Sequence, residues 1–260
     1  MSFWSVLSHL AILIWAYATI VFAVSVLLRR NDIADVAWGL GFALIGSWFL
    51  FQGVSHQTFL WVFGMVVLWA LRLALHIGSR MVGKSEDFRY RAWREAWGKT
   101  FYWRSYLQVY LLQGAFMFVV AAPIIAAGLG EVSDKWWALL SQIFGSLVFS
   151  VGLFFETVGD YQLAQFLKNR KDKEAVLDTG LWRYSRHPNY FGDIMVWWGL
   201  FLIVLPMPLG WLAVIGPLTI TYLLVFVSGV PMLERRYIGN VAYEAYKKRT
   251  SVLIPRCPRS

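Results

Sequence analysis

The sequence has little cysteine and no pattern typical of a soluble nucleotide-binding fold. Cys257 is the only cysteine among 260 residues, which excludes an intramolecular disulfide. No GxGxxG, P-loop or zinc-ligand spacing occurs, so no metal site is predicted. Linkers, low-complexity tracts and clear internal repeats are also absent, which favours a single domain over residues 1–260.

Charged residues are scarce at 15%, whereas hydrophobic residues make up 58% and tryptophan occurs 15 times. This composition is typical of a polytopic membrane protein. Crossing a hydrocarbon core of ~30 Å takes about 20 apolar residues. The runs near this length are 5–28, 35–52, 58–79, 105–129, 136–165, 190–206 and 209–232. We therefore expect an all-α bundle of seven transmembrane helices. The first run lacks a basic n-region, so we expect it to be retained as a span.

The basic residues predict the orientation of these spans. Of the 24 Lys and Arg, 22 lie in residues 29–30, the 80–104 and 168–187 loops, and the 235–260 tail. Only Lys135 lies in an opposite loop, and Arg72 lies inside the third span. The positive-inside rule then predicts a multi-pass membrane protein with its N-terminus outside and its C-terminus in the cytoplasm. This topology and contact with membrane lipids account for the net charge of +9, so nucleic acid is not a predicted partner.

Ionisable side chains inside spans are costly, and each is therefore a candidate functional residue. Asp35, near the start of the second span, is either a first-turn helix acid or a functional group. Arg72, His76 and Arg80 lie at i, i+4 and i+8 on one face of the third span. Arg80 at the helix end also fits simple snorkelling. We expect this stripe to form a polar channel to the cytoplasmic surface.

Two acids share a face near the cytoplasmic end of the fifth span. Glu156 and Asp160 lie at i and i+4, and they repel each other unless a basic or hydrogen-bond-donating group lies between them. Ribose hydroxyls or an adenine amine would serve as such a group. Arg183 or Arg186 from the next loop would serve equally well.

Residues 181–193 form the most polar stretch of the chain, directly before an apolar run. Arginine makes bidentate contacts to phosphate, and tyrosine offers a stacking face and a hydroxyl. The 84–90 loop and the tail around Tyr243 and Arg249 have similar chemistry. Because all these segments are expected on the cytoplasmic side, we expect them to roof a pocket for an anionic, aromatic ligand from the cytosol.

Residues 180–192 resemble the C-terminal signature of the steroid 5-alpha-reductase-like membrane proteins. They are closest to the bacterial branch known as a domain of unknown function (DUF1295), which implies a location in a bacterial inner membrane. Residues 35–39, Arg72 with His76 and Arg80, residues 86–90, and Asp160 look like further marks of that branch. The resemblance therefore covers nearly the whole chain. Isoprenylcysteine carboxyl methyltransferases share an Arg-His-Pro-x-Tyr element, and they use S-adenosylmethionine.

The resemblance implies that the cytoplasmic half binds NADPH in a cavity open to the cytosol. The residues implied are Arg72, His76, Arg80, Asp87, Arg89, Tyr90, Glu156, Asp160, Tyr184, Arg186, His187, Asn189, Tyr190, Asp193, Tyr243 and Arg249. Asp35 is the stand-in for a glutamate of the steroid enzymes, and Trp69 lies where those enzymes have a tyrosine. These two are the candidate catalytic residues. Tryptophan can donate a hydrogen bond but cannot act as an acid, which sets the chain apart from the steroid enzymes.

The preferred interpretation is an NADPH-dependent reductase of the C=C bond of a lipophilic enone that enters from the bilayer. A protonated Asp35 would meet the negative charge that develops on the carbonyl oxygen. The alternative is an S-adenosylmethionine-dependent methyltransferase of a membrane lipid or prenylated thiol. A third class is a lipid-binding or scaffold protein without nucleotide affinity. No oligomeric state is predicted.

Overall fold

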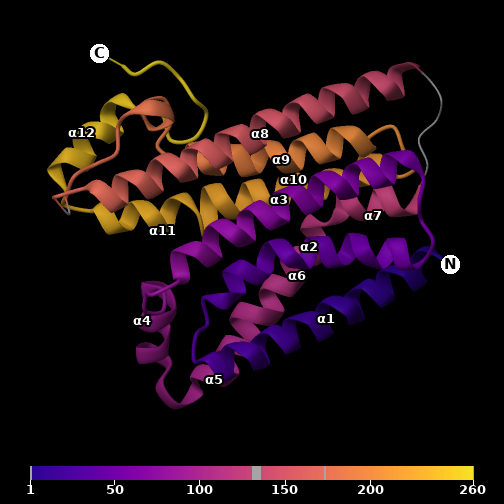
Figure 1. Cartoon of the computed structure of the whole chain (residues 1–260), viewed down its shortest axis with the longest axis horizontal. Helices are drawn as coiled ribbons and strands as arrows, with labels where there is room; N and C mark the ends of the chain where they lie inside the picture. Colours follow the sequence, from indigo (N-terminus) through magenta and orange to yellow (C-terminus); the bar gives the residue numbers. More distant parts are fainter. Residues whose placement is uncertain (1, 131–135, 173, 260) are drawn as a thin grey trace. The chain divides into compact units, whose positions relative to one another are not determined.

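The structure, a computed structural model, describes residues 2–130, 136–172 and 174–259. All named elements in this part are helices, and the predicted all-α class is confirmed. The chain divides into two compact units (Figure 1). The first comprises Met1–Ser133 with Met207–Ile215, and the second comprises Asp134–Pro206 with Gly216–Ser260. A single domain over 1–260 stays a prediction. Lys135, the basic residue predicted in an opposite loop, lies outside the described residues.

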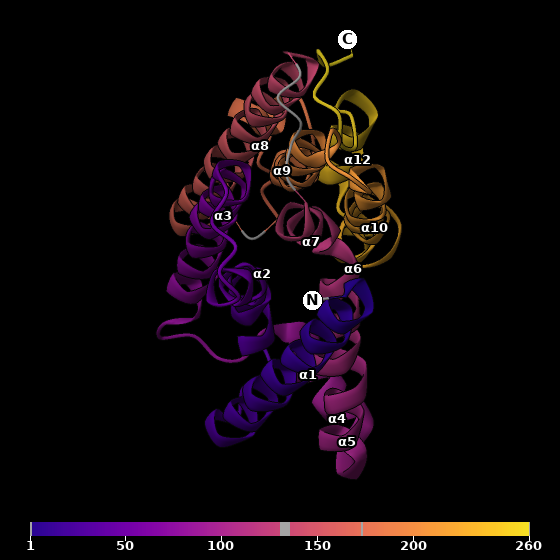
Figure 2. The same ribbon diagram turned by 90° about the vertical axis from the view of Figure 1, so that its right-hand side faces the viewer.

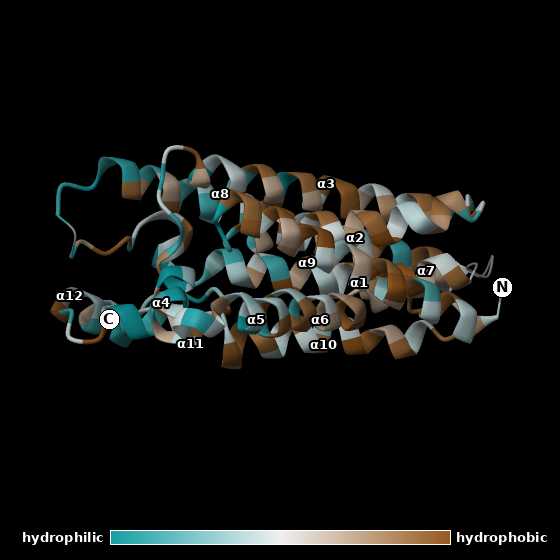
Figure 3. Ribbon diagram, turned by 90° about the horizontal axis from the view of Figure 1, so that it is seen from below, coloured by the Kyte–Doolittle hydropathy of each residue, from teal (hydrophilic) through white to brown (hydrophobic). Residues whose placement is uncertain are grey.

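Three long helices open the first unit: α1 (Phe3–Leu28), α2 (Ile33–Phe51) and α3 (Gln57–Met81). α2 packs against both α1 and α3 (Figure 1). Phe42, Phe49, Phe59 and Trp69 are fully buried in this packing. Figure 3 shows hydrophobic residues along most of α1 and α3, and hydrophilic residues at α4.

The expected fourth span differs from its predicted bounds. The helix begins at α4 (Phe88–Trp97) and runs through η1 (Gly98–Thr100), α5 (Phe101–Ser105), the π-helix η2 (Tyr106–Leu111) and α6 (Leu112–Val120). It then bends by 49° into α7 (Ala122–Leu129). Pro123 explains the break, because proline lacks the N–H that a continuous helix would need there. The run predicted as a span, 105–129, falls within this bent pair of helices. η4 (Gly210–Val214) packs against α7 and completes the unit.

The second unit is built on α8 (Trp136–Asn169) and α9 (Pro188–Val204), which run side by side in Figure 1 and are neighbours in the end-on view of Figure 2. The short helix η3 (Gly180–Arg183) connects them. The remaining elements are α10 (Ile215–Tyr222), the π-helix η5 (Leu223–Val227), α11 (Val230–Glu234), η6 (Arg235–Tyr237) and α12 (Val241–Arg249).

Glycines at seven-residue spacing allow α8 and α9 to approach closely. A Cβ on Gly152 of α8 would lie 2.6 Å from the Val196 nitrogen, and one on Gly199 of α9 would lie 2.5 Å from the Phe149 nitrogen. A Cβ on Gly145 of α8 would likewise lie too close to α9, at 2.7 Å from the Gly199 oxygen. Small residues let helix backbones pack in direct contact, as is common inside membranes.

The chain has the multiple apolar helices of a multi-pass integral membrane protein. Within the described residues five helical stretches are long and apolar enough to cross a bilayer, or six if the bent pair counts as one span. The expected span over 190–206 corresponds to α9, whose 17 residues cover about 25 Å. Seven spans and their orientation stay predictions.

Candidate functional site

Four predicted site residues meet in the first unit, where the first turns of α2 and α4 come together. Asp35 accepts hydrogen bonds from Arg89 Nη2 at 2.6 Å and from the Tyr90 hydroxyl at 2.7 Å. Arg89 also pairs with Asp87 at 2.9 Å. Asp87 caps α4 by accepting from the Arg89 backbone N–H. Asp35 is therefore more than a first-turn helix acid, because a guanidinium and a phenol both donate hydrogen bonds to its carboxylate.

A second layer of polar contacts fixes this cluster. Asp32 accepts from Arg30 at 2.9 Å and from the Asp87 backbone N–H at 2.9 Å. Glu86 accepts from Arg94 and from the Asn31 backbone N–H at 2.7 Å. Burial alone would raise the pKa of Asp32, but the hydrogen bonds from Arg30 and from the Asp87 N–H outweigh it and lower that pKa.

The other candidates of the first unit lie on α3. Trp69 is fully buried and packs edge-to-face on Phe42, with ring centroids 5.7 Å apart. Arg72 and His76 are half-buried and Arg80 is exposed, which is the order expected for a stripe that leads out of the helix bundle. The helix itself, Gln57–Met81, confirms that these residues follow one another at helical spacing.

Arg186 is the centre of the polar network in the second unit. Its side chain is 7% exposed, and its Nε donates to Glu234 at 2.8 Å. Its Nη1 donates to the carbonyls of Thr250 at 2.8 Å and Lys247 at 3.2 Å, which end α12. The guanidinium thereby ties α11 and α12 to the segment that precedes α9.

His187 lies beside the same acid. Its Nε2 is 3.3 Å from Glu234, and its ring stacks on Tyr190 with centroids 5.4 Å apart. Burial lowers the pKa of the imidazole in spite of Glu234, which favours the neutral ring. A carboxylate only accepts, so Nε2 carries the proton and Nδ1 is an acceptor. Within the described part of the chain this buried Nδ1 has no hydrogen-bond partner.

Asp160 and Asn189 join α8 to the start of α9. The Asn189 amide donates to Asp160 at 3.0 Å, and both Asp160 and Glu156 are buried on the α8 face that meets α9. The predicted shared face of the two acids is therefore observed. Arg186, one of the partners considered for them, instead forms its ion pair with Glu234.

The remaining predicted residues surround the C-terminal segment. The Tyr184 carbonyl accepts from the Arg256 N–H at 3.0 Å, and its side chain is 40% exposed. Tyr243 is buried and stacks on Tyr237 with centroids 4.3 Å apart. Arg249 donates to Asp178 in an ion pair, and Asp193 is half-buried on the second turn of α9.

A groove of about 480 Å³ lies along the end of α8 in the second unit. Its lining residues are Tyr161, Gln162, Gln165, Phe166, Asn169, Arg170, Leu177, Thr179 and Gly180. The Gln162 carbonyl accepts from the Leu181 N–H at 3.0 Å, which fixes the segment that forms one wall. Gly180 has a φ of 59°, where a side chain would be strained, and its Cβ would lie 2.5 Å from Gln162.

The family described as "Protein of unknown function (DUF1295)" matches residues 21–250. The chain belongs to the DUF1295 family. No curated protein and no solved structure matches the chain. The matched region contains every candidate residue from Asp35 to Arg249, in both units.

In this DUF1295 chain, the predicted set missed several residues that the structure places at the centre of the clusters. Glu234 is the acid partner of Arg186 and His187, and its only sequence signal is an acid directly before Arg235 and Arg236. Asn31 has no such signal, because its role depends on a hydrogen bond to Ser105, far away in the sequence. Arg170 and Tyr161 of the groove were also missed, because a surface helix end looks the same whether or not a groove lies beside it.

Proposed function

We propose that this DUF1295 protein is an NADPH-dependent reductase of the C=C bond of a lipophilic enone taken from the bilayer. The observation that carries the proposal is the groove of about 480 Å³ along the end of α8. Its volume lies within the range of roughly 300–1,000 Å³ that is usual for small-molecule and cofactor sites. Its walls combine aromatic faces, amides and one arginine, which are the groups that a nucleotide with phosphates requires.

The groove residues divide naturally by chemistry. Tyr161 and Phe166 offer ring faces for an adenine, and Gln165 and Asn169 offer amide donors and acceptors for ribose hydroxyls. Arg170 offers a guanidinium for a phosphate. NADPH, when bound, would supply the hydride.

Arg186 has a supporting role in this proposal. Its donors are directed to Glu234 and to two carbonyls of the chain, so it shapes the segment beside the groove instead of binding a phosphate. In the first unit, the proposed role of Asp35 toward the substrate carbonyl is indirect: its carboxylate holds the Tyr90 hydroxyl, which is the group that can donate a proton. Because Arg89 pairs with it, Asp35 is an acceptor, and the proton of that cluster resides on the Tyr90 oxygen.

Titration calorimetry on detergent-purified protein tests the cofactor assignment. We expect NADPH to bind more tightly than NADH, and Arg170→Gln to weaken NADPH binding about tenfold, the scale of one charge-assisted contact. Lys168→Gln is the matched control, because Lys168 is a neighbouring exposed base that does not line the groove. Equal losses in the two variants would mean that only the general positive charge matters.

The catalytic assignment needs a separate measurement. Asp35→Asn should leave NADPH affinity unchanged and reduce turnover of an enone by roughly 10²-fold, the usual contribution of a positioned acid or base. Tyr90→Phe should have an effect of the same order if the proton on its oxygen is used. Turnover equal to that of the parent in both variants would remove this cluster from the chemistry.

S-adenosylmethionine-dependent methylation is the second candidate. The observation that favours it is the pairing of Arg186 with Glu234 and of Arg249 with Asp178, since an arginine paired with an acid contributes less to binding a phosphate-rich cofactor. The same calorimetry distinguishes the two. Binding of S-adenosylmethionine without binding of NADPH would favour a methyltransferase over a reductase. Binding of neither would favour a non-enzymatic lipid-binding protein.

A further inference from the structure

A short helix at one end of the first unit runs across the long helices. Figure 1 shows α4 lying across the direction of α1 and α3, at the end where these two candidate spans finish. The chain then turns at Gly98, whose φ is 48°, and enters α5 and the rest of the bent pair of helices. α4 and the start of α5 therefore lie at the level where the hydrocarbon of a bilayer ends and its headgroups begin.

The charges at this end of the unit do not balance. Among residues 29–35 and 84–105, four acids are paired with arginines of the same region: Asp32, Asp35, Glu86 and Asp87. Glu95 is exposed and makes no ion pair in this described part of the chain. Five bases are also exposed and have no acid partner there: Arg29, Lys84, Arg91, Lys99 and Arg104. A surplus of positive charge therefore faces outward.

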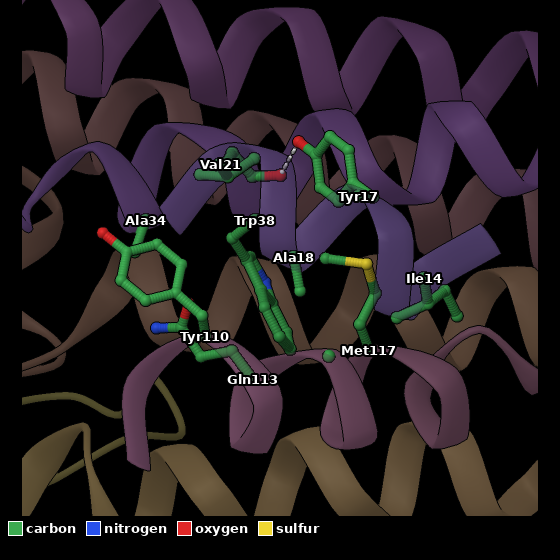
Figure 4. A pocket seen from close by; sticks show the side chains of 11 residues that line it. Ile14, Tyr17, Ala18, Val21, Ala34, Trp38, Tyr110, Gln113 and Met117 are labelled. Atoms are coloured by element: carbon green, nitrogen blue, oxygen red, sulfur yellow. Dashed lines mark hydrogen bonds between the residues drawn. The ribbon is translucent and has the colours of Figure 1, made fainter. Parts of the chain in front are cut away.

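Hydrogen bonds hold two of these bases on neighbouring parts of the backbone. The Asn31 amide donates to the Ser105 hydroxyl at 2.8 Å. Arg29 lies two residues before Asn31 and Arg104 directly precedes Ser105, so both bases belong to the edge where the turn between α1 and α2 meets α5. Tyr110, whose ring borders the pocket in Figure 4, donates to the Asn31 carbonyl at 3.3 Å. The turn is thereby fixed from inside the unit, while its bases stay outside.

Exposed aromatic rings lie next to these bases. Tyr102 and Trp103, which directly precede Arg104, are 50% and 65% exposed. Their backbone is held in place, because the Arg94 guanidinium of α4 lies over the Phe101 ring of α5, 4.0 Å from its centroid. Tyrosine and tryptophan are enriched at the boundary between hydrocarbon and headgroups, since each ring combines an apolar body with a polar group. The surface thus combines ring faces with cations at one level of the unit.

Two physical arguments favour an anionic lipid as the partner of these bases. Anionic lipids give a leaflet a negative surface potential, which attracts Lys and Arg next to a span and strengthens binding about fivefold for each base. Arginine also makes two parallel hydrogen bonds to a phosphate. Snorkelling and the positive-inside rule place bases at span ends as well, but neither requires a particular headgroup. Preference for an anionic headgroup therefore separates a lipid-binding surface from simple orientation of the chain.

We propose that a basic and aromatic surface of the first unit binds the headgroups of anionic phospholipids. This surface consists of Arg29, Lys84, Lys99, Tyr102, Trp103 and Arg104. Arg29 and Arg104 bind the phosphate of the headgroup, and Lys99 adds to the positive field. Tyr102 and Trp103 pack against the glycerol and the upper acyl chains. The surface lies wholly within the first unit, and it depends neither on nucleotide binding nor on reductase activity.

Native mass spectrometry of the full chain in detergent tests the proposal. The protein is titrated with phosphatidylglycerol and, separately, with phosphatidylcholine of the same acyl chains, so that the headgroup alone differs. We expect the first phosphatidylglycerol to bind about tenfold more tightly or better, and the difference to shrink as the salt concentration rises. Equal dissociation constants for the two lipids would overturn the proposal. Full displacement of phosphatidylglycerol by an equal concentration of inorganic phosphate would also overturn it, because the lipid would then contribute nothing.

Matched double variants locate the site. Arg29→Gln combined with Arg104→Gln should weaken binding of the first phosphatidylglycerol about 25-fold, from about fivefold for each base, and leave phosphatidylcholine binding unchanged. Arg235→Gln combined with Lys248→Gln removes two exposed bases of the second unit and should leave both affinities unchanged. Equal losses in the two double variants would show that only the total charge matters, and this result would overturn the proposal.

Photolabelling of the parent protein decides the question even if a variant fails to fold. Phosphatidylglycerol with a diazirine close to its glycerol is incorporated into nanodiscs around the full chain, and labelled peptides are mapped by mass spectrometry. Labels should concentrate in peptides that contain residues 27–30 and 97–105, and the matching phosphatidylcholine probe should label these peptides about tenfold less. Equal labelling by the two probes, or labels confined to the second unit, would overturn the proposal.

Discussion

Arg186 holds three segments of the second unit together. Its guanidinium reaches Glu234 in α11 and the carbonyls that end α12, while its own backbone N–H donates to the Ser251 carbonyl at 2.9 Å. Its Nε and Nη1 donors are already used within the chain, which makes Arg186 first a structural residue. Its removal would leave Glu234 without its strongest partner.

Arg186→Ala should therefore act on stability first. We expect a loss of roughly 3 kcal/mol, typical of breaking a buried ion pair, and a clearly lower thermal midpoint in detergent. Arg183→Ala is the control. Arg183 is the last residue of η3 and is exposed, so its removal should change the thermal midpoint little. If Arg186→Ala kept the parent midpoint and lost only nucleotide binding, a direct contact to phosphate would be the better account.

His187 makes stability depend on pH. Burial lowers the pKa of its imidazole below the unfolded value of about 6.5, so the folded state binds fewer protons. The stabilisation is complete above that value and is lost as the pH falls through it toward the folded pKa. Arg186 and Glu234 are the charged groups that act on the ring. Thermal midpoints measured from pH 8 to pH 5.5 should fall, with a slope of up to ~1.4 kcal/mol per pH unit from this group.

His187→Gln removes this titration and should flatten the profile over that range. His9→Gln, on an exposed residue of α1, should keep the parent slope and serves as the control. A His187→Gln profile as steep as that of the parent protein would show that other groups carry the pH dependence.

At the scale of elements, the α8–α9 pair is specified by its glycines. On α8 they recur every seven residues. A Cβ on Gly145 or Gly152 would lie within 2.7 Å of backbone atoms of α9, and one on Gly159 would lie 3.2 Å from the Asn189 nitrogen. Because the contacts are to backbone atoms, no rotamer change of a neighbour can relieve a clash there.

Gly152→Ala should destabilise the protein by roughly 1–3 kcal/mol, since its Cβ would meet the Val196 nitrogen at 2.6 Å and the Gly192 oxygen at 2.7 Å. Gly78→Ala in α3 is the matched control, because open space surrounds it. That change should be neutral or stabilising by up to ~1 kcal/mol, the difference in helix propensity. Thermal unfolding of both variants in one detergent measures the contrast, and similar losses in the two would contradict the packing argument.

The helices themselves were largely predictable, whereas their breaks were not. Apolar length gave α1, α2, α3 and α8 close to their observed bounds. The amphipathic helix from Phe88 to Trp97 lies within the predicted 80–104 loop, because hydropathy does not reveal a helix rich in charged residues. Its Arg89 and Arg94 pair with Asp35 and Glu86. Hydropathy averages over a window, so it also conceals the bend at Ala121.

The residues of the candidate site were predictable too, whereas the contacts between them were not. Sequence reasoning found residues such as Asp35, Arg89 and His187, because ionisable groups beside apolar runs are unusual. It did not find which of them pair. The partner of Arg186 is Glu234, 48 positions away, and only the folded chain brings them within 2.8 Å.

For the whole molecule, the distribution of charge predicts the orientation in the membrane. Because 22 of 24 basic residues lie in alternate segments, the C-terminal tail should be cytoplasmic and Lys135 should lie outside. Reporter fusions after Ser55, Asp134 and Ser260 measure this directly. The first two should report an outside location and the third a cytoplasmic one, and an outside location for the fusion after Ser260 would contradict the seven-span topology.

The C-terminal segment determines when the second unit can finish folding during synthesis. Ser185 pairs with Ser251 in a parallel bridge, its hydroxyl donates to the Leu253 carbonyl, and the Tyr184 carbonyl accepts from Arg256. The ribosome adds Leu253 68 residues after Ser185, when α8 and α9 have already been synthesised. Within that interval Arg186 lacks its acid until Glu234 is made, 48 residues later, and it lacks its carbonyl acceptors until Lys247 and Thr250 follow. A nascent chain that stalls before Arg256 would therefore present an incomplete second unit to the quality-control proteases of the membrane.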